Sequence, residues 1–183
     1  MQAGKLLLKP YCHGVENELF RLIQQNLTDL THSFPQMLGA TRTQAETKEY
    51  IQGKIRLWNK NEALAFLVYS DGKLAGHFNL KDIDWKLPKA ELAYWIDASL
   101  RRKGLMTAVI QTMLQFAFEK LQMERVAAKI VTSNIASERV LQKAGLKYEG
   151  TFIHDYRTFD NRIVDTHIYA LTKDDYFRQK LKP

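Results

Sequence analysis

Hydrophobic positions along the chain alternate between a spacing of two residues and a spacing of three to four, which predicts a mixture of strands and helices. Short apolar or alternating runs predict strands over residues 4–11, 62–84, 89–98, 125–132, 146–156 and 163–172. Helical spacing predicts helices over residues 14–28, 43–60, 105–121 and 134–145. We expect a loop around Pro35 and turns at Asp71-Gly72 and Asp160-Asn161, so that residues 62–84 form a hairpin.

Local signals support the helix ends. Thr43 followed by Glu46 has the spacing of a capping box, and Asn134 and Gly145 are typical of the start and end of a helix. The first helix places five apolar residues at helical spacing: Val15, Leu19, Leu22, Ile23 and Leu27. Side chains alternate across the strand over residues 89–98, so Glu91 and Trp95 are expected on one face and Tyr94 on the other.

The predicted order is β-α-α-β-β-β-α-β-α-β-β, an α/β (α+β) fold with a mixed sheet and helices on both faces. Residues 89–132 read as strand, helix and strand, which predicts a right-handed parallel crossover. A length of 183 residues without repeats or a Gly/Ser/Pro linker suits one domain over residues 1–183.

The chain carries a formal net charge of +7, which favours anionic partners or serves solubility alone. The basic residues are dispersed without a nucleic-acid signature, so direct nucleic-acid binding is not expected. No membrane association is expected because the longest uncharged apolar run, residues 63–70, is strand-sized. The absence of a secretory signal and the single Cys12 favour a cytoplasmic protein. The five histidines have no metal-ligand spacing, so we expect no metal.

The stretch LRRKGLMTAV, residues 100–109, places three cations and a glycine at the start of a predicted helix. The first N–H groups of a helix are unpaired and attract anions, and Gly104 would let a ligand approach the backbone. Arg101, Arg102 and Lys103 add positive charge. The position after a parallel strand is where α/β sheets often bind ligands. These residues predict either a phosphate site or a solvated basic turn.

Three segments in order resemble the core of the GNAT acetyltransferase superfamily, from about Leu64 to Leu171. They are AELAYWI, Arg101-x-x-Gly104, and SNIASERVLQKAGLKYEG. Within the superfamily the chain is most similar to the ribosomal-protein N-terminal acetyltransferases that modify serine- and alanine-initiated proteins. Met106 departs from the small residue that is usual at the end of the phosphate loop.

The resemblance implies acetyl-CoA as cosubstrate, with its pyrophosphate on the backbone N–H groups of residues 102–107 and its pantetheine beside the Tyr94–Ile96 strand. It also places Asn134 near the pantetheine arm or nucleotide and Ser137 near the thioester sulfur. The expected cofactor-binding residues are Tyr94, Trp95, Ile96, Arg101, Arg102, Lys103, Gly104, Leu105, Met106, Thr107, Asn134 and Ser137. Asn134 and Ser137 are also ordinary residues for the first turn of a helix.

Acetyl transfer to an amine needs a neutral amine, a stabilised oxyanion and a protonated leaving thiolate. Glu91, a charged residue on an apolar strand that matches the family glutamate, is the candidate base; the alternative is a solvated edge glutamate. Ser137 and Tyr156 are the candidate donors to the thiolate, and Tyr156 could equally be a packing aromatic. A covalent route through Cys12 is not expected, because its neighbour His13 would point the other way.

The predicted function is N-acetyltransfer by direct attack in a ternary complex to an N-terminal α-amine of a ribosomal or other protein. The resemblance is also compatible with a homodimer, because relatives often pair. A small-molecule amine acetyltransferase and a non-catalytic acyl-CoA-binding module are the alternatives. The net charge disfavours cationic substrates such as aminoglycosides and polyamines. Glu91 and Ser137 disfavour a non-catalytic module.

Overall fold

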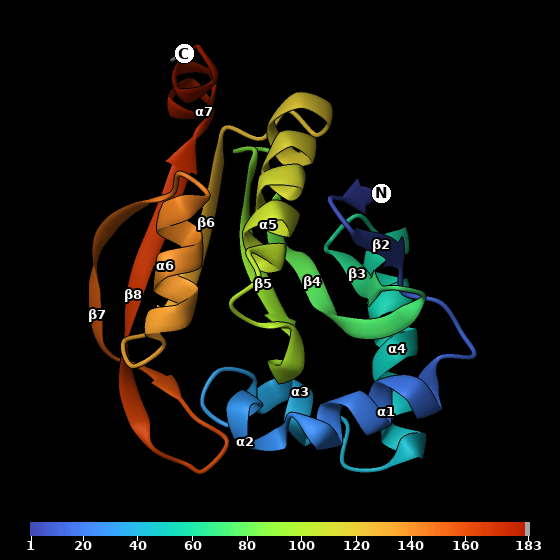
Figure 1. Ribbon diagram of the computed structural model, residues 1–183. Helices are drawn as coiled ribbons and strands as arrows, with labels where there is room; N and C mark the ends of the chain where they lie inside the picture. Colours follow the sequence, from blue (N-terminus) through green and yellow to red (C-terminus); the bar gives the residue numbers. More distant parts are fainter. Residues whose placement is uncertain (182–183) are drawn as a thin grey trace.

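The computed structural model describes residues 1–181, which build one eight-stranded sheet in the order β1-β2-β3-β4-β5-β6-β8-β7 (Figure 1). The strands are β1 Gln2–Ala3, β2 Leu6–Pro10, β3 Leu64–Ser70, β4 Lys73–Asp84, β5 Lys89–Ile96, β6 Arg125–Val131, β7 Lys147–Arg157 and β8 Ile163–Thr172. Neighbouring strands are antiparallel except for β5 and β6, which are parallel, as the sequence predicts.

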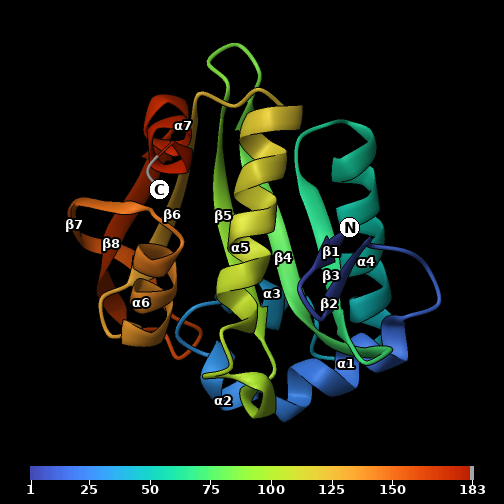
Figure 2. The ribbon, with the colours of Figure 1, turned by 45° about the horizontal axis from the view of Figure 1, so that its top comes forward.

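Helices lie on both faces of the sheet (Figure 2). They are α1 Glu16–Gln25, α2 Leu27–Leu30, α3 Pro35–Gly39, α4 Gln44–Asn59, α5 Leu105–Gln115, α6 Ile135–Lys143 and α7 Lys173–Lys180. Within residues 1–181 no helix is both long and apolar enough to cross a membrane.

Two apolar clusters hold these layers together, one on each face of the sheet. The larger includes Leu92, Tyr94 and Ile96 of β5 with the buried side of α5. The smaller includes Trp95 of the same strand with residues of α1, α3 and α4. The alternation of β5 between the two clusters confirms the two faces predicted from the sequence.

The predicted local signals are confirmed. Thr43 and Glu46 form a reciprocal capping box at the start of α4. The Asn134 side chain accepts a hydrogen bond from the Ser137 N–H at the start of α6, and Gly145 follows that helix with φ +93°. The β3–β4 hairpin turns at Asp71-Gly72.

The predicted element order is wrong in detail, because it lacks β1, α2, α3 and α7. The predicted helix over residues 14–28 is also wrong, since it is divided into α1 and α2 at Asn26. The buried Asn26 amide accepts from the Ala98 N–H at 2.9 Å and donates to the Asp97 carboxylate at 3.0 Å. This contact ties the break to the loop after β5. Leu27, placed by prediction on the apolar face, is 40% exposed.

The helix predicted over residues 105–121 is α-helical only as far as Gln115. A π-helical turn, Phe116–Lys120, completes it. This turn keeps Ala117 and Phe118 in the larger cluster, while Leu121 is only partly buried.

Candidate active site

The site is a cleft formed where β5 and β6 separate. The two strands pair at only three positions, ending at Glu91 opposite Ala127. Beyond that point β5 keeps its pairing with β4 and β6 keeps its pairing with β8. The inner edges of the two strands therefore face a cleft of about 600 Å³. Residues of α4 and of α6, which lie on opposite faces of the sheet, both line it (Figure 2).

All three predicted catalytic residues line this cleft: Glu91, Ser137 and Tyr156. They come from β5, α6 and β7. The fold therefore brings together residues that are far apart in the sequence, since Glu91 and Tyr156 are separated by 65 positions. Tyr94 and Asn134, two of the predicted cofactor-binding residues, line the cleft as well.

Glu91 lies inside the cleft and carries an ion pair. Its Oε1 is 2.7 Å from Lys81 Nζ on the neighbouring strand, and the Glu91 side chain is 22% exposed. Lys81 also contacts Asp82 at 2.6 Å. Burial alone would lower the pKa of Lys81, but its hydrogen bonds to Asp82 and Glu91 raise it above the ordinary value. Lys81 therefore stays charged beside Glu91. The alternative of a solvated edge glutamate does not describe this position.

Tyr156 approaches Glu91 from the opposite side of the cleft. Its hydroxyl donates a hydrogen bond to the Ser33 carbonyl at 2.9 Å. Burial, together with the negative charge of Glu91, raises the pKa of Tyr156 to about 12. The phenol therefore stays protonated at neutral pH and is a possible proton donor.

The start of α6 presents Ser137 and Asn134 to the cleft. The Ser137 N–H donates to Asn134 Oδ1 at 3.1 Å, which fixes the first turn of the helix. The Asn134 amide in turn donates to Ser33 Oγ at 3.4 Å. The Tyr94 hydroxyl donates to the Ser137 carbonyl at 3.4 Å, and burial raises the pKa of Tyr94. Asn134 is thus a helix cap whose amide also faces the cleft.

The glycine turn lies at the start of α5. Gly104 has φ +73°, a conformation that favours glycine, and a Cβ added there would meet open space. Within residues 1–181, the backbone N–H groups of residues 102–107 donate to no acceptor. Consecutive N–H groups without partners at a helix start form an anion-binding geometry.

The charges around this turn differ from the prediction. Arg101 is not free, because its guanidinium pairs with Asp29 at 3.0 Å. Lys103 Nζ donates to the Ser99 carbonyl at 3.1 Å. Arg102 is exposed, with φ +62°. The positive field at the turn therefore comes from the backbone N–H groups, Arg102 and Lys103 more than from Arg101.

Several predicted cofactor-binding residues have side chains that point into the protein. Trp95, Ile96 and Met106 are buried in the two apolar clusters. They can contact a ligand only through their backbone atoms. Leu105 and Thr107 are partly buried at the first turn of α5.

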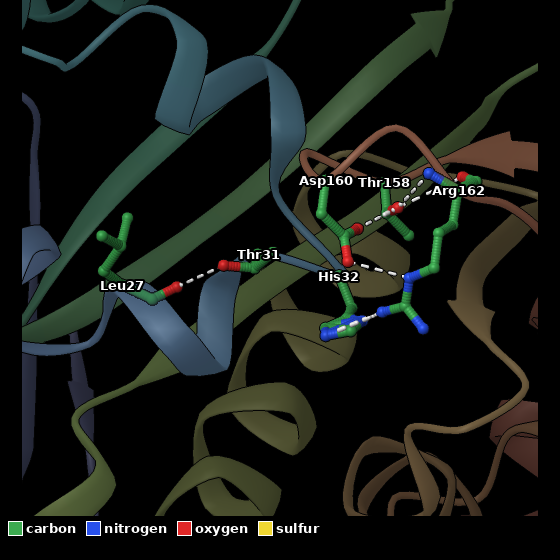
Figure 3. Close-up of polar contacts among 6 residues, drawn as sticks. All are labelled: Leu27, Thr31, His32, Thr158, Asp160 and Arg162. Carbon is green, nitrogen blue, oxygen red and sulfur yellow. Dashed lines mark hydrogen bonds and ion pairs between the residues drawn. The ribbon is translucent and has the colours of Figure 1, made fainter.

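The segment over residues 31–34, which no sequence pattern indicated as part of the site, ties one end of the cleft to the β7–β8 hairpin. Figure 3 shows Arg162 beside the ring of His32, with an Arg162 nitrogen 2.6 Å from His32 Nδ1. The Phe159 N–H donates to the Thr31 carbonyl at 2.9 Å. Because Ser33 meets Tyr156 from this segment, the segment positions one of the candidate donors.

His77 and Lys54 also line the cleft and were not predicted. His77 is buried, and its Nδ1 lies 2.9 Å from the Tyr11 hydroxyl. Burial, and then the charge of Lys54, lower the pKa of His77 well below its ordinary value. His77 is therefore a neutral group at pH 7. A single histidine or lysine in a strand or helix carries no sequence signal that would have identified it.

Comparisons with known proteins agree with this architecture. Residues 5–147 match the family described as the acetyltransferase (GNAT) domain. The ribosomal-protein-serine acetyltransferase of Escherichia coli (strain K12) is 24% identical over 154 residues, covering 83% of this chain and 84% of that protein. YdaF of Bacillus subtilis (strain 168), named as a candidate ribosomal N-acetyltransferase, is 37% identical over 86 residues, which is 47% of this chain and only 46% of that relative.

A solved structure shares the fold over nearly its whole length. It is RimL, a ribosomal L7/L12 α-N-protein acetyltransferase in complex with coenzyme A, with a TM-score of 0.84 and 24% identity. The match covers 94% of this chain and 96% of that one. Since the family match alone spans well over half of the sequence, this chain belongs to the GNAT acetyltransferase family.

Proposed function

We propose that this protein transfers the acetyl group of acetyl-CoA to the N-terminal α-amine of a protein, with ribosomal proteins as the acceptor class. The observation that carries the proposal is the cleft between β5 and β6, which is lined by Glu91, Ser137 and Tyr156. The names of the two relatives and of the RimL structure, which refer to ribosomal proteins, support the acceptor class.

The residues present fit acetyl-CoA. The unpartnered N–H groups of residues 102–107 would hold the pyrophosphate, and Gly104 leaves room for it. The free edge of β5 beyond Glu91 would pair with the amide groups of the pantetheine arm, as an added strand would. Asn134 and Ser137 face the cleft from α6, where the thioester would lie between the two separated strands. Acetyl-CoA supplies the activated acetyl group.

Glu91 is proposed as the base that takes the proton of the attacking amine. Lys81 contacts Oε1 at 2.7 Å, and a carboxylate has about four acceptor positions on its two oxygens, so Glu91 can also accept from the amine or from a bridging water. An α-amine has a pKa near ~8, against roughly 10.4 for a lysine side chain, so it needs much less help at neutral pH. A carboxylate base is therefore matched to an α-amine acceptor better than to a lysine.

Ser137 and Tyr156 are proposed to stabilise the leaving thiolate. Tyr156 keeps its proton at neutral pH but donates it to the Ser33 carbonyl, so it must turn from that contact to reach the sulfur. The Ser137 side chain faces the cleft at the first turn of α6, where its hydroxyl needs no such rearrangement. We therefore assign Ser137 as the first donor and Tyr156 as the second.

The proposal is tested with acetyl-CoA and a panel of peptides that differ in their first residue, each containing one internal lysine. Mass spectrometry should locate the acetyl group on the N-terminal α-amine, foremost on peptides that begin with Ser or Ala. Exclusive modification of the internal lysine would overturn the proposal, and so would transfer to small amines alone. A Cys12→Ala variant should keep full activity, because Cys12 is exposed and does not line the cleft.

A further inference from the structure

The charged side chains lining the cleft are three lysines and three acids: Lys54, Lys81, Lys129, Asp82, Glu91 and Asp155. Two of the lysines are compensated. Lys81 pairs with Glu91 at 2.7 Å and with Asp82 at 2.6 Å. Lys129 pairs with Asp155 at 3.3 Å. Two of the three acids share Lys81, so the six charges sum to zero while the third lysine forms no ion pair with a cleft carboxylate.

That cation is Lys54, on the side of α4 that faces the cleft. Within residues 1–181, Lys54 Nζ has no carboxylate oxygen within 4.0 Å and donates no hydrogen bond. Its ammonium lies 5.0 Å from the centre of the Tyr50 ring, which is a cation–π contact. Burial, and then the charge of Lys81, lower the pKa of Lys54, and the charge of Asp82 only partly opposes this. A partly buried ammonium without a counter-ion is costly unless a ligand supplies one.

We propose that Lys54 binds a carboxylate of the acceptor, so that the preferred acceptors carry an acidic group a short distance from the amine. This inference rests on the proposed function and names the substrate class for the same cleft. Lys54 lies close enough to Lys81 and Asp82 for their charges to act on it, and Lys81 contacts Glu91, the proposed base.

The size of the cleft limits where the carboxylate belongs in the acceptor. Lys54 and Glu91 line the same cleft of about 600 Å³, and an extended chain advances roughly 3.3–3.6 Å per residue, so a carboxylate bound at Lys54 while the amine is at Glu91 belongs to the first few residues. In a protein acceptor it is an Asp or Glu side chain at the second or third position. The α-carboxylate of a free amino acid has the same chemistry and is the other source.

The test compares matched peptides that differ only by Glu against Gln at position two, and again at position three, with serine first. For each we would measure kcat/KM in the wild type, in Lys54→Met and in Lys54→Arg. A charge-assisted hydrogen bond in a partly buried site predicts a preference of roughly tenfold or more for the acidic peptide. The preference should fall towards one in Lys54→Met, mainly through KM, and should largely return in Lys54→Arg. In the second arm of the test, kcat/KM for free serine is compared with that for its α-amide, and kcat/KM for free glutamate is compared with that for its α-amide.

The control variant is Lys48→Met, which removes an exposed lysine from the same helix, away from the cleft. It should keep the wild-type preference, and both lysine-to-methionine variants should bind acetyl-CoA with wild-type affinity. An equal rate for acidic and amide peptides in the wild type would overturn the inference while leaving the proposed function intact. A preference that survives in Lys54→Met would also overturn it. Acetylation of no peptide in the panel would instead overturn the proposed function. A preference confined to the free amino acids would identify a small acceptor.

Discussion

Replacing Glu91 by Gln removes the proposed base while preserving the shape of the side chain. General-base catalysis typically contributes 10²–10⁴-fold, so turnover at pH 7 should fall by roughly 10²-fold or more. At about 1.36 kcal/mol per factor of ten, the lower bound corresponds to about 2.7 kcal/mol of lost transition-state stabilisation. Acetyl-CoA affinity should barely change, because the proposed phosphate contacts lie at the start of α5 and not at Glu91.

The expected loss of stability is much smaller than the loss of turnover. The Glu91 and Lys81 side chains are 22% and 35% exposed, and pairs with this access to water are worth about 1 kcal/mol or less. Lys81 also keeps its second partner, Asp82, at 2.6 Å. For a chain of this size the melting temperature should therefore fall by no more than roughly 2–4 °C.

The pH dependence separates loss of the base from damage to the fold. The neutral fraction of an α-amine rises as the pH passes its pKa near ~8, so the variant needs the base less at high pH. The ratio of wild-type to variant kcat/KM should shrink between pH 7 and pH 9. Steady-state rates of CoA thiol release with one α-amine peptide measure this ratio. A misfolded variant would be equally poor at every pH.

Asp82→Asn provides the matched control. It weakens the other ion pair of Lys81 and leaves Glu91 in place, and asparagine tolerates the φ of +52° at this position. Its turnover should stay within about threefold of wild type, since exposed ion pairs contribute little. Normal turnover of Glu91→Gln at pH 7 would refute the assignment. Deprotonation of the amine by solvent would then be the better account.

Three further results are expected. Acetyl-CoA at 100 times its Kd should stabilise the wild type by about 2.7 kcal/mol, roughly 5–11 °C in a thermal melt; Gly104→Val should lose this shift. Gly72→Val, which also places valine in open space at φ +78°, should keep the acetyl-CoA shift. Loss of the shift in Gly72→Val but not in Gly104→Val would place the anion site elsewhere. Gly76→Ala should lower the free energy of unfolding by about 2 kcal/mol, or the melting temperature by roughly 4–8 °C, because the added Cβ would lie 2.3 Å from a backbone oxygen of β5. The control Gly150→Ala places its Cβ in open space and should melt as the wild type does. His77 stays neutral in the folded protein but takes a proton in the unfolded chain below about pH 6.5. The free energy of unfolding should therefore fall by up to about 1.4 kcal/mol for each pH unit below that value. Chemical denaturation that shows the same free energy of unfolding at about pH 6.5 and about pH 5.5 would contradict this.

The turns and helix caps that the sequence predicted correctly depend on contacts within a few residues. The capping box of Thr43 and Glu46 spans one helical turn, and the Asp71-Gly72 turn is set by two adjacent residues. The elements that were missed lack such signals. Strand β1 has only two residues, and α7 buries only Tyr176 among eight mostly charged or polar residues, so neither has a usable hydrophobic period.

The site shows the same division between local and distant contacts. The position of Glu91 on its strand could be predicted, because alternation along β5 is a local property. Its pairing with Lys81 depends on the register between β4 and β5, which shifts between Lys81 and Asp84. The hydrogen bond from Tyr156 to Ser33 joins residues 123 apart, and no spacing in the sequence indicates it.

The distribution of charged residues along the sequence could not predict which chemical group of the acceptor the cleft binds. The sequence places three cations in a row at residues 101–103 and so draws attention to that turn, yet Arg101 is already paired with Asp29. Lys54 stands in an ordinary amphipathic helix, and nothing near it in the sequence distinguishes it from Lys48. Only the packing of α4 against the cleft, where the acids are paired with Lys81 and Lys129, leaves Lys54 without a carboxylate in the described part of the chain. An anion-binding site is therefore located by which cations lack a partner, and a net charge of +7 cannot supply that information.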